Sequence, residues 1–270
     1  MVSSGHKSNP GNSSKYKDLK RVVSVYFSRK LLLQLNDQEC SNKTMTDLNC
    51  PWMQYPRGTF PLCEEALCEW IRQPSNTYSN LGFFLVAFYL IYLFIKKQSD
   101  HGLGFGICAI LIGTASFGAH ASGTKLFAFF DFAAIFSAFS LYAAKDMIYT
   151  NTVKTKNFFV VFAAFFIPAA LMLYNFTVLR EVIFAAFVIG LLTWESKILK
   201  AQGKPFLTTS NKKLLGIFLF GTICLALDAS KVVCNPQNHL FQMHSLWHVC
   251  CALSVYFLAR HLDQHRPNNN

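Results

Sequence analysis

The chain divides into a polar first part and an apolar second part. Residues 1–60 are polar and show no hydrophobic periodicity. From residue 79 onward, seven apolar stretches follow, each roughly long enough to cross a bilayer core of about 30 Å. They cover residues 79–95, 102–119, 126–149, 157–177, 180–196, 213–230 and 240–259. Because lipid offers no hydrogen-bond partner to backbone amides, each stretch is predicted to be a helix.

The resulting fold class is an all-α integral membrane protein, a seven-transmembrane helix bundle or barrel with a polar N-terminal extension. We divide the chain into the extension (1–60), a pre-membrane segment (61–78), the transmembrane domain (79–262) and a C-terminal tail (263–270). The fourth stretch contains Pro168, which a membrane helix tolerates as a kink.

Composition supports the membrane class. Apolar residues make up 52% of the chain and charged residues 14%, whereas a typical soluble domain has about 25% charged residues. Lys and Arg exceed Asp and Glu by 25 − 14 = 11. Since these basic residues lie between the apolar stretches, they indicate loops at an anionic membrane surface rather than a nucleic-acid partner.

Basic residues near the ends of the stretches predict the orientation. One side carries Lys96, Lys97, Lys145, Lys154, Lys156, Lys197, Lys200, Lys204, Lys212, Lys213, Arg260 and Arg266. The other side carries Arg72, Lys125, Arg180 and Lys231. This asymmetry predicts a cytoplasmic C-terminus and a non-cytoplasmic N-terminus.

The nine cysteines form two groups. Cys108, Cys224, Cys250 and Cys251 lie inside apolar stretches and are predicted to pack as small hydrophobic residues. Cys40, Cys50, Cys63, Cys68 and Cys234 lie outside them. In an oxidising compartment Cys40 and Cys50 are a candidate pair, and an odd number leaves one cysteine over.

Few ionisable residues lie within or beside the apolar stretches, where their cost makes them candidates for function. They are His120, Asp131, Asp146, Glu195, Asp228, His244 and His248. We expect Asp146 and Glu195 to reach the membrane interface near Lys145 and Lys197. The other five all come to the non-cytoplasmic end, because successive stretches alternate in direction.

His244 and His248 are spaced i,i+4, so both rings project from one helix face. With His120 they supply three nitrogen ligands, which together with an open position are typical of a catalytic zinc site. The alternative is a set of hydrogen-bonded core histidines. Ser116, one turn before His120, is either a helix-packing residue or a hydroxyl that binds water or an oxyanion beside the metal.

An ordered set of motifs resembles the alkaline ceramidase family, within a wider group that includes adiponectin receptors and GPI-anchor remodelling proteins. The set comprises Cys63 and Glu64, residues 71–80 (IRQPSNTYSN), residues 116–120 (SFGAH), Asp131, Asp228 and residues 244–248 (HSLWH). The resemblance covers about residues 61–262, and Gln73 with Pro74 looks most like a bacterial-type branch. It implies a seven-helix barrel that holds zinc through its three histidines, with Asp131 and Ser116 as catalytic residues.

In alkaline ceramidases a calcium ion also binds the acidic segment before the first span. Glu64 fits that pattern, but Gln73 stands where a calcium-binding Glu is expected. Pro61, Leu62 and Ala66 replace other members of the loop. The match to the calcium site is therefore incomplete, and zinc is the cofactor that the resemblance supports.

The mechanistic hypothesis follows from this set. A zinc ion held by the three histidines would supply a bound water with a pKa near about 7 and a Lewis acid for the oxyanion. Asp131 would accept the proton of that water and return it to the leaving amine, and Ser116 would help to stabilise the oxyanion. Asp228 either orients a ligand histidine or caps a helix. The resemblance implies ceramide as the substrate, an amide with two long chains, with sphingosine and fatty acid as products. The alternatives are an acyl-ester lipase acting on a glycolipid or GPI anchor, and a non-enzymatic seven-helix receptor or transporter.

Overall fold

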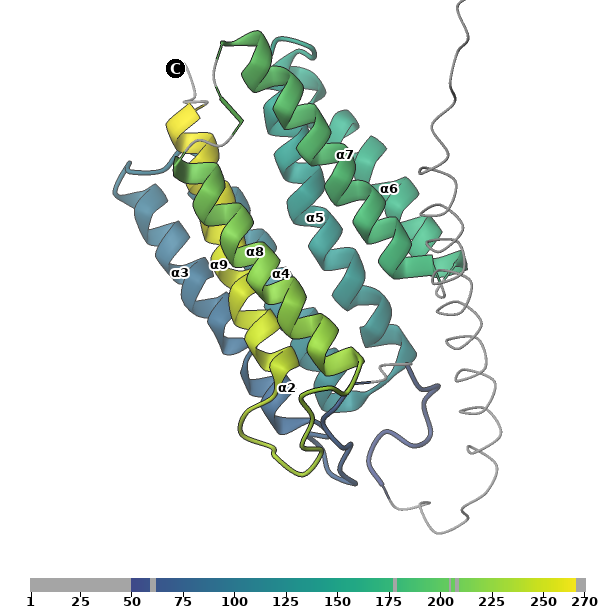
Figure 1. Cartoon of the computed structure of the whole chain (residues 1–270). Coiled ribbons are helices and arrows are strands. Elements are labelled where there is room, and N and C mark those ends of the chain that lie inside the picture. The colour runs from purple at the N-terminus through teal and green to yellow at the C-terminus, as the bar shows by residue number, and fades with distance from the viewer. Residues whose placement is uncertain (1–49, 59–61, 177–178, 204, 207–208, 266–270) are drawn as a thin grey trace, which may run out of the picture. The chain divides into compact units, whose positions relative to one another are not determined.

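The computed structural model describes residues 50–58, 62–176, 179–203, 205–206 and 209–265. In this part of the chain the predicted stretches form seven long helices (Figure 1). They are α3 (Leu81–Ile95), α4 (Gly102–Ser122), α5 (Lys125–Tyr149), α6 (Phe158–Asn175), α7 (Arg180–Ala201), α8 (Thr209–Ala229) and α9 (Met243–His265). Two short elements join them, α2 (Pro74–Tyr78) and the 3₁₀ turn η1 (Thr155–Asn157). The all-α prediction is confirmed, since the described residues contain no strand.

Five segments are long and apolar enough to cross a membrane by length and composition. They are Pro74–Ile95, Gly102–Ser122, Lys125–Tyr149, Thr155–Asn175 and Arg180–Ala201. The helices α8 and α9 have similar lengths, and they carry Asp228 (α8) and His244 and His248 (α9). Large apolar side chains point outward, with Leu85 71% and Phe159 79% exposed, as expected for helices that face lipid.

The α4 helix contacts α3, α5 and α9. Its glycines permit the close approach of α3: a Cβ at Gly106 would lie 2.7 Å from Cγ1 of Ile91, and one at Gly113 would lie 2.9 Å from Cβ of Phe83. Phe83 and Phe105 are almost fully buried in the resulting core. This packing fixes α4, the helix that carries His120 and Ser116.

A second core joins α5, α6 and α7 through aromatic rings around the fully buried Phe136. Its ring lies edge-on to Phe187, with centroids 5.1 Å apart. Pro168 lies inside α6, which runs through it from Phe158 to Asn175. Phe184 of α7 also meets Phe218 of α8 and Trp247 of α9, so aromatic side chains connect the two halves of the bundle.

Asp146 and Glu195 depart from the sequence-based expectation. Instead of reaching the membrane interface, both are buried inside the protein, at 0% and 5% exposure. Asp146 accepts a hydrogen bond from the indole N–H of Trp194, and Glu195 meets Tyr142 and His261. Internal donors therefore replace the water that the interface would have supplied.

Two disulfides hold the segments around the beginning of α9. Cys50 pairs with Cys68, and Cys63 pairs with Cys234. The candidate pair of Cys40 and Cys50 is therefore wrong: Cys68 is the partner of Cys50, and Cys40 lies outside the described residues. Residues 1–49, Lys204 and Arg266 also lie outside them. The four cysteines of the apolar stretches are free, as predicted.

Candidate metal centre

Three histidines come together at the end of the bundle where α4 ends and α9 begins. His120 lies in the last turn of α4, whereas His244 and His248 lie one turn apart at the start of α9. All three are buried, with exposures of 1%, 7% and 4%. Their ligand nitrogens all lie within 4.8 Å of one another. The helical i,i+4 spacing thus aims both α9 rings at the ring from α4.

The separation of the nitrogens fits a tetrahedral metal ion. Nε2 of His244 lies 3.3 Å from Nε2 of His120. Zinc–nitrogen bonds of 2.0–2.1 Å in tetrahedral geometry place two ligand nitrogens about 3.3–3.4 Å apart. The donor set therefore fits zinc without a change in the position of these two rings, and it leaves a fourth position for water or substrate.

The Nδ1 atoms of two rings, those of His248 and His120, have defined hydrogen-bond partners. Ser79 Oγ donates to the carbonyl oxygen of Asn76, at 2.9 Å, and lies 2.8 Å from Nδ1 of His248. Because the single hydroxyl proton goes to Asn76, Ser79 must accept the N–H of His248 Nδ1. This tautomer leaves the lone pair of Nε2 facing the centre of the cluster, where a metal requires it.

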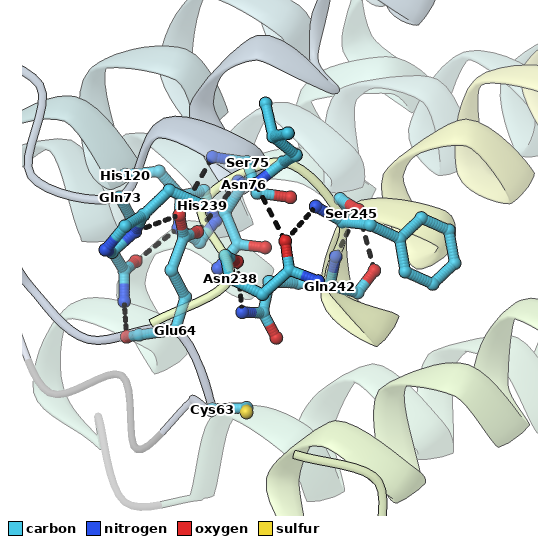
Figure 2. A network of polar contacts seen from close by, with 12 residues as sticks. Cys63, Glu64, Gln73, Ser75, Asn76, His120, Asn238, His239, Gln242 and Ser245 are labelled. Carbon is cyan, nitrogen blue, oxygen red and sulfur yellow. Dashed lines mark hydrogen bonds and ion pairs between the residues drawn. The ribbon is translucent and has the colours of Figure 1, made fainter. Parts of the chain in front are cut away.

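Gln73 orients the ring of His120 in the same way, by accepting the N–H of its Nδ1 (Figure 2). Its amide nitrogen donates to the carbonyl oxygen of Glu64, at 3.0 Å, so its side-chain oxygen accepts the N–H of His120 Nδ1, at 2.9 Å. Sequence reasoning did not assign Gln73 and Ser79 this role. Both lie in the polar run directly before α3, and their position in residues 71–80 of the family motif was the signal available.

Glu64 holds the segment that carries these two residues. Its carboxylate is 3% exposed and accepts the backbone N–H groups of Ser75 and Asn76, both at 2.9 Å. Nδ1 of His239 lies 3.1 Å from the oxygen that accepts from Ser75 (Figure 2). Glu64 therefore binds the first turn of α2 to the loop between α8 and α9. Each carboxylate oxygen already faces at least one nitrogen, an arrangement suited to N–H donors rather than to a cation.

Asp228 joins three segments at the end of α8. One carboxylate oxygen accepts the backbone N–H of His244, at 3.1 Å, and the other accepts the backbone N–H of Cys63, at 2.9 Å. The carboxylate thus contacts the backbone of a ligand residue and holds the first turn of α9. The bond to Cys63 and the Cys63–Cys234 disulfide keep the pre-membrane segment at the same place.

The side chain of Asp131 in α5 faces that of Ser116 in α4. Both are buried, and the Asp131 carboxylate and the Ser116 hydroxyl interact. Ser116 lies one turn before His120 on the same face of α4. Arg180 of α7 stacks over the ring of Phe132, 4.8 Å from its centroid, and acts electrostatically on Asp131. The arrangement brings a carboxylate and a hydroxyl to the histidine end of the bundle.

The site therefore combines three nitrogens able to hold a metal ion, a carboxylate able to carry a proton and a hydroxyl able to donate to an oxyanion. Metal-assisted hydrolysis needs such a set. No curated protein sequence matches the chain. The model of the family described as Ceramidase matches residues 55–269, which include every residue of the site. The chain belongs to the ceramidase family.

Proposed function

We propose that this protein is a zinc-dependent hydrolase that cleaves the amide bond of ceramide within the membrane and releases sphingosine and a fatty acid. One observation carries the proposal: Nε2 of His120 and of His244 stand 3.3 Å apart, in a buried cluster beside the interacting Asp131 and Ser116. Membership of the ceramidase family supports the amide as the bond cleaved.

His120, His244 and His248 would hold the zinc ion, which when bound supplies a Lewis acid and lowers the pKa of water. Asp131 takes a proton from the attacking water and delivers it to the nitrogen of the leaving amine. Ser116 donates a hydrogen bond to the carbonyl oxygen as negative charge develops on it. Water is thereby added across the C–N bond: its hydroxyl group ends on the fatty acid and its proton on sphingosine.

The predicted orientation puts this chemistry on the non-cytoplasmic side of the membrane. Both disulfides lie in the segments around the histidine end of the bundle. Structural disulfides persist in oxidising compartments. They agree with the distribution of Lys and Arg, which predicts that the opposite end faces the cytoplasm.

The decisive experiment is product analysis with purified protein in detergent micelles. The substrates are a ceramide and a diacylglycerol of matched acyl length, and mass spectrometry follows free sphingosine and free fatty acid. We expect sphingosine and fatty acid in equal amounts from ceramide, and about 10²- to 10⁴-fold slower release from the Asp131→Asn variant. Release of fatty acid from the ester alone would overturn the amidase assignment in favour of an ester lipase.

A further inference from the structure

An apolar cavity lies inside the bundle, between the level just below the candidate metal centre and the opposite end. Residues of α5, α7, α8 and α9 form most of its wall. At one end it is lined by Ile135, Trp247 and Cys251. Ile135 follows Asp131 by one helical turn, and Cys251 follows His248 by one turn. The cavity therefore begins directly below the level of the candidate site.

A polar group lines the other end of this apolar space. Tyr142, Glu195 and His261 all line the cavity. The Tyr142 hydroxyl donates to one oxygen of Glu195, and Nε2 of His261 lies 3.0 Å from the other. Glu195 is 5% and His261 1% exposed. These three side chains, which we call the polar floor, come from three different helices.

An alkyl chain cannot replace the contacts of the polar floor. A methyl end that displaced Tyr142 or His261 would leave the buried Glu195 carboxylate without those partners, which is costly in a low-dielectric interior. The apolar wall favours each added methylene, whereas the floor opposes any carbon that would enter it. The boundary between the two is therefore sharp.

The depth of the cavity corresponds to a long acyl chain. His248 and His261 are thirteen residues apart on α9, which is about 20 Å of helix, and the eleven residues from Asp131 to Tyr142 on α5 make about 16 Å. An extended alkyl chain advances roughly 1.25 Å per carbon, given C–C bonds of about 1.5 Å. A chain whose carbonyl lies at the metal centre thus meets the polar floor after roughly 13–16 carbons.

We infer that the fatty acyl chain of the substrate occupies this cavity and that Tyr142, Glu195 and His261 set the longest chain accepted. The acyl chain, rather than the sphingoid chain, is assigned because it is the one attached to the carbonyl carbon under attack. The inference rests on the proposed function and adds a specificity-determining group to it. The polar floor acts on binding and not on the chemical step.

The test measures kcat/KM for ceramides whose acyl chains increase from six to twenty-four carbons. Each methylene that enters the cavity should raise kcat/KM up to about fourfold, the equivalent of its hydrophobic transfer. The increase in kcat/KM should stop, or reverse, at roughly 13–16 carbons. A steady rise across the whole series would overturn the inference.

A matched pair on α7 tests where the chain lies. Val188 lines the cavity seven residues, or about 10 Å, before Glu195, whereas its neighbour Ile189 is 63% exposed on the outer surface. Val188→Trp should shorten the longest accepted chain by about eight carbons, to roughly five to eight, with hydrolysis of six-carbon ceramide affected least. Ile189→Trp should leave the profile unchanged. An unshifted profile in Val188→Trp, or equal shifts in both variants, would contradict the inference.

The double variant Glu195→Ala/His261→Ala tests the polar floor itself. It removes Glu195 and His261 together, so that neither of these two side chains stays without the other. The longest accepted chain should increase by about three or four carbons, and an unchanged limit would overturn the role of the floor. Displacement of a fluorescent fatty acid by unlabelled fatty acids of increasing length gives the same limit without hydrolysis. If no ceramide is cleaved but this limit still moves in Val188→Trp, the proposed function fails and the cavity assignment stands. If ceramide is cleaved and the limit does not move in Val188→Trp, the proposed function stands and the cavity assignment fails.

Discussion

The side-chain oxygen of Gln73 lies 2.9 Å from Nδ1 of His120, and this contact joins the segment before the first transmembrane helix to a metal ligand. The side-chain amide of Gln73 makes two hydrogen bonds. Its nitrogen donates to the backbone carbonyl of Glu64, and its oxygen accepts from the His120 ring. The position of His120 therefore depends on a residue that directly precedes the first candidate span, Pro74–Ile95. His248 meets Ser79, which lies near the beginning of that span.

Replacing Gln73 should weaken metal binding without removing a ligand. In Gln73→Leu the His120 ring loses its acceptor and can adopt the wrong tautomer, so we expect zinc affinity to fall about 10- to 100-fold. Competition with a chromophoric chelator measures the change. Gln202→Leu, at an exposed position after α7, is the control and should keep the original affinity. Equal affinities in the two variants would exclude the orienting role.

His244→Ala should abolish stoichiometric zinc. Two nitrogens remain in that variant, too few for a closed or catalytic zinc site. Elemental analysis of protein purified without chelators should find about one zinc per chain in the original protein and far less in the variant. His101→Ala removes a histidine that pairs with Asp263 instead and should retain the metal. Protein that holds no zinc before mutation would refute the metal centre.

Asp131→Asn should separate chemistry from metal binding. Asn cannot carry the proton, so ceramide hydrolysis should fall by about 10²- to 10⁴-fold. The zinc content should stay unchanged, because Asp131 is not among the three ligands. Full activity in this variant would rule out Asp131 as the proton carrier, whereas loss of zinc would make it a structural support of the site.

Glu64 should behave as a structural carboxylate rather than as a calcium ligand. Its oxygens accept two backbone N–H groups and face His239. We expect no change in activity on adding a calcium-selective chelator or excess calcium. Glu64→Gln should lower the free energy of unfolding by about 1.5–3 kcal/mol, because hydrogen bonds to a charged group are lost. Calcium-dependent activity that disappears in Glu64→Gln would reverse this assignment.

The Cys63–Cys234 disulfide should contribute measurably to stability. It closes a loop with a sequence separation of 171, and the loss of such a cross-link typically costs about 2–4 kcal/mol. Thermal unfolding of Cys63→Ser should show a lower Tm, and the double variant Cys63→Ser/Cys234→Ser should lose little more, because both remove the same bond. Additive losses would mean that the two cysteines act separately.

The lengths of the apolar stretches and the alternating direction of successive helices were sufficient to predict the architecture. The seven helices followed from the apolar stretches, and the meeting of His120, His244 and His248 followed from the direction of the helices that carry them. These features depend on local pattern, because the membrane requires each span to form a helix. The helix ends depart from the predicted ends by up to six residues, at the C-terminal end of α9.

Local pattern and helix direction could not predict contacts between segments that are distant in sequence. Nothing local to Glu195 indicates that it meets His261, sixty-six residues later, so an expectation based on its nearness to Lys197 placed it at the interface. The pairing of Cys50 with Cys68 and the partners of Glu64 likewise depend on loop conformations. Loops have no periodicity from which to infer these contacts.

The distribution of the three histidines over α4 and α9 has a consequence for biosynthesis. The first ligand is made early, but the other two arrive only with α9, the last of the described helices, 124 residues later. A nascent chain that has inserted six helices holds one ligand and cannot form the centre. Under the proposed function, incompletely made copies cannot hydrolyse the lipids around them, and zinc can bind only after the last helix has entered the bundle.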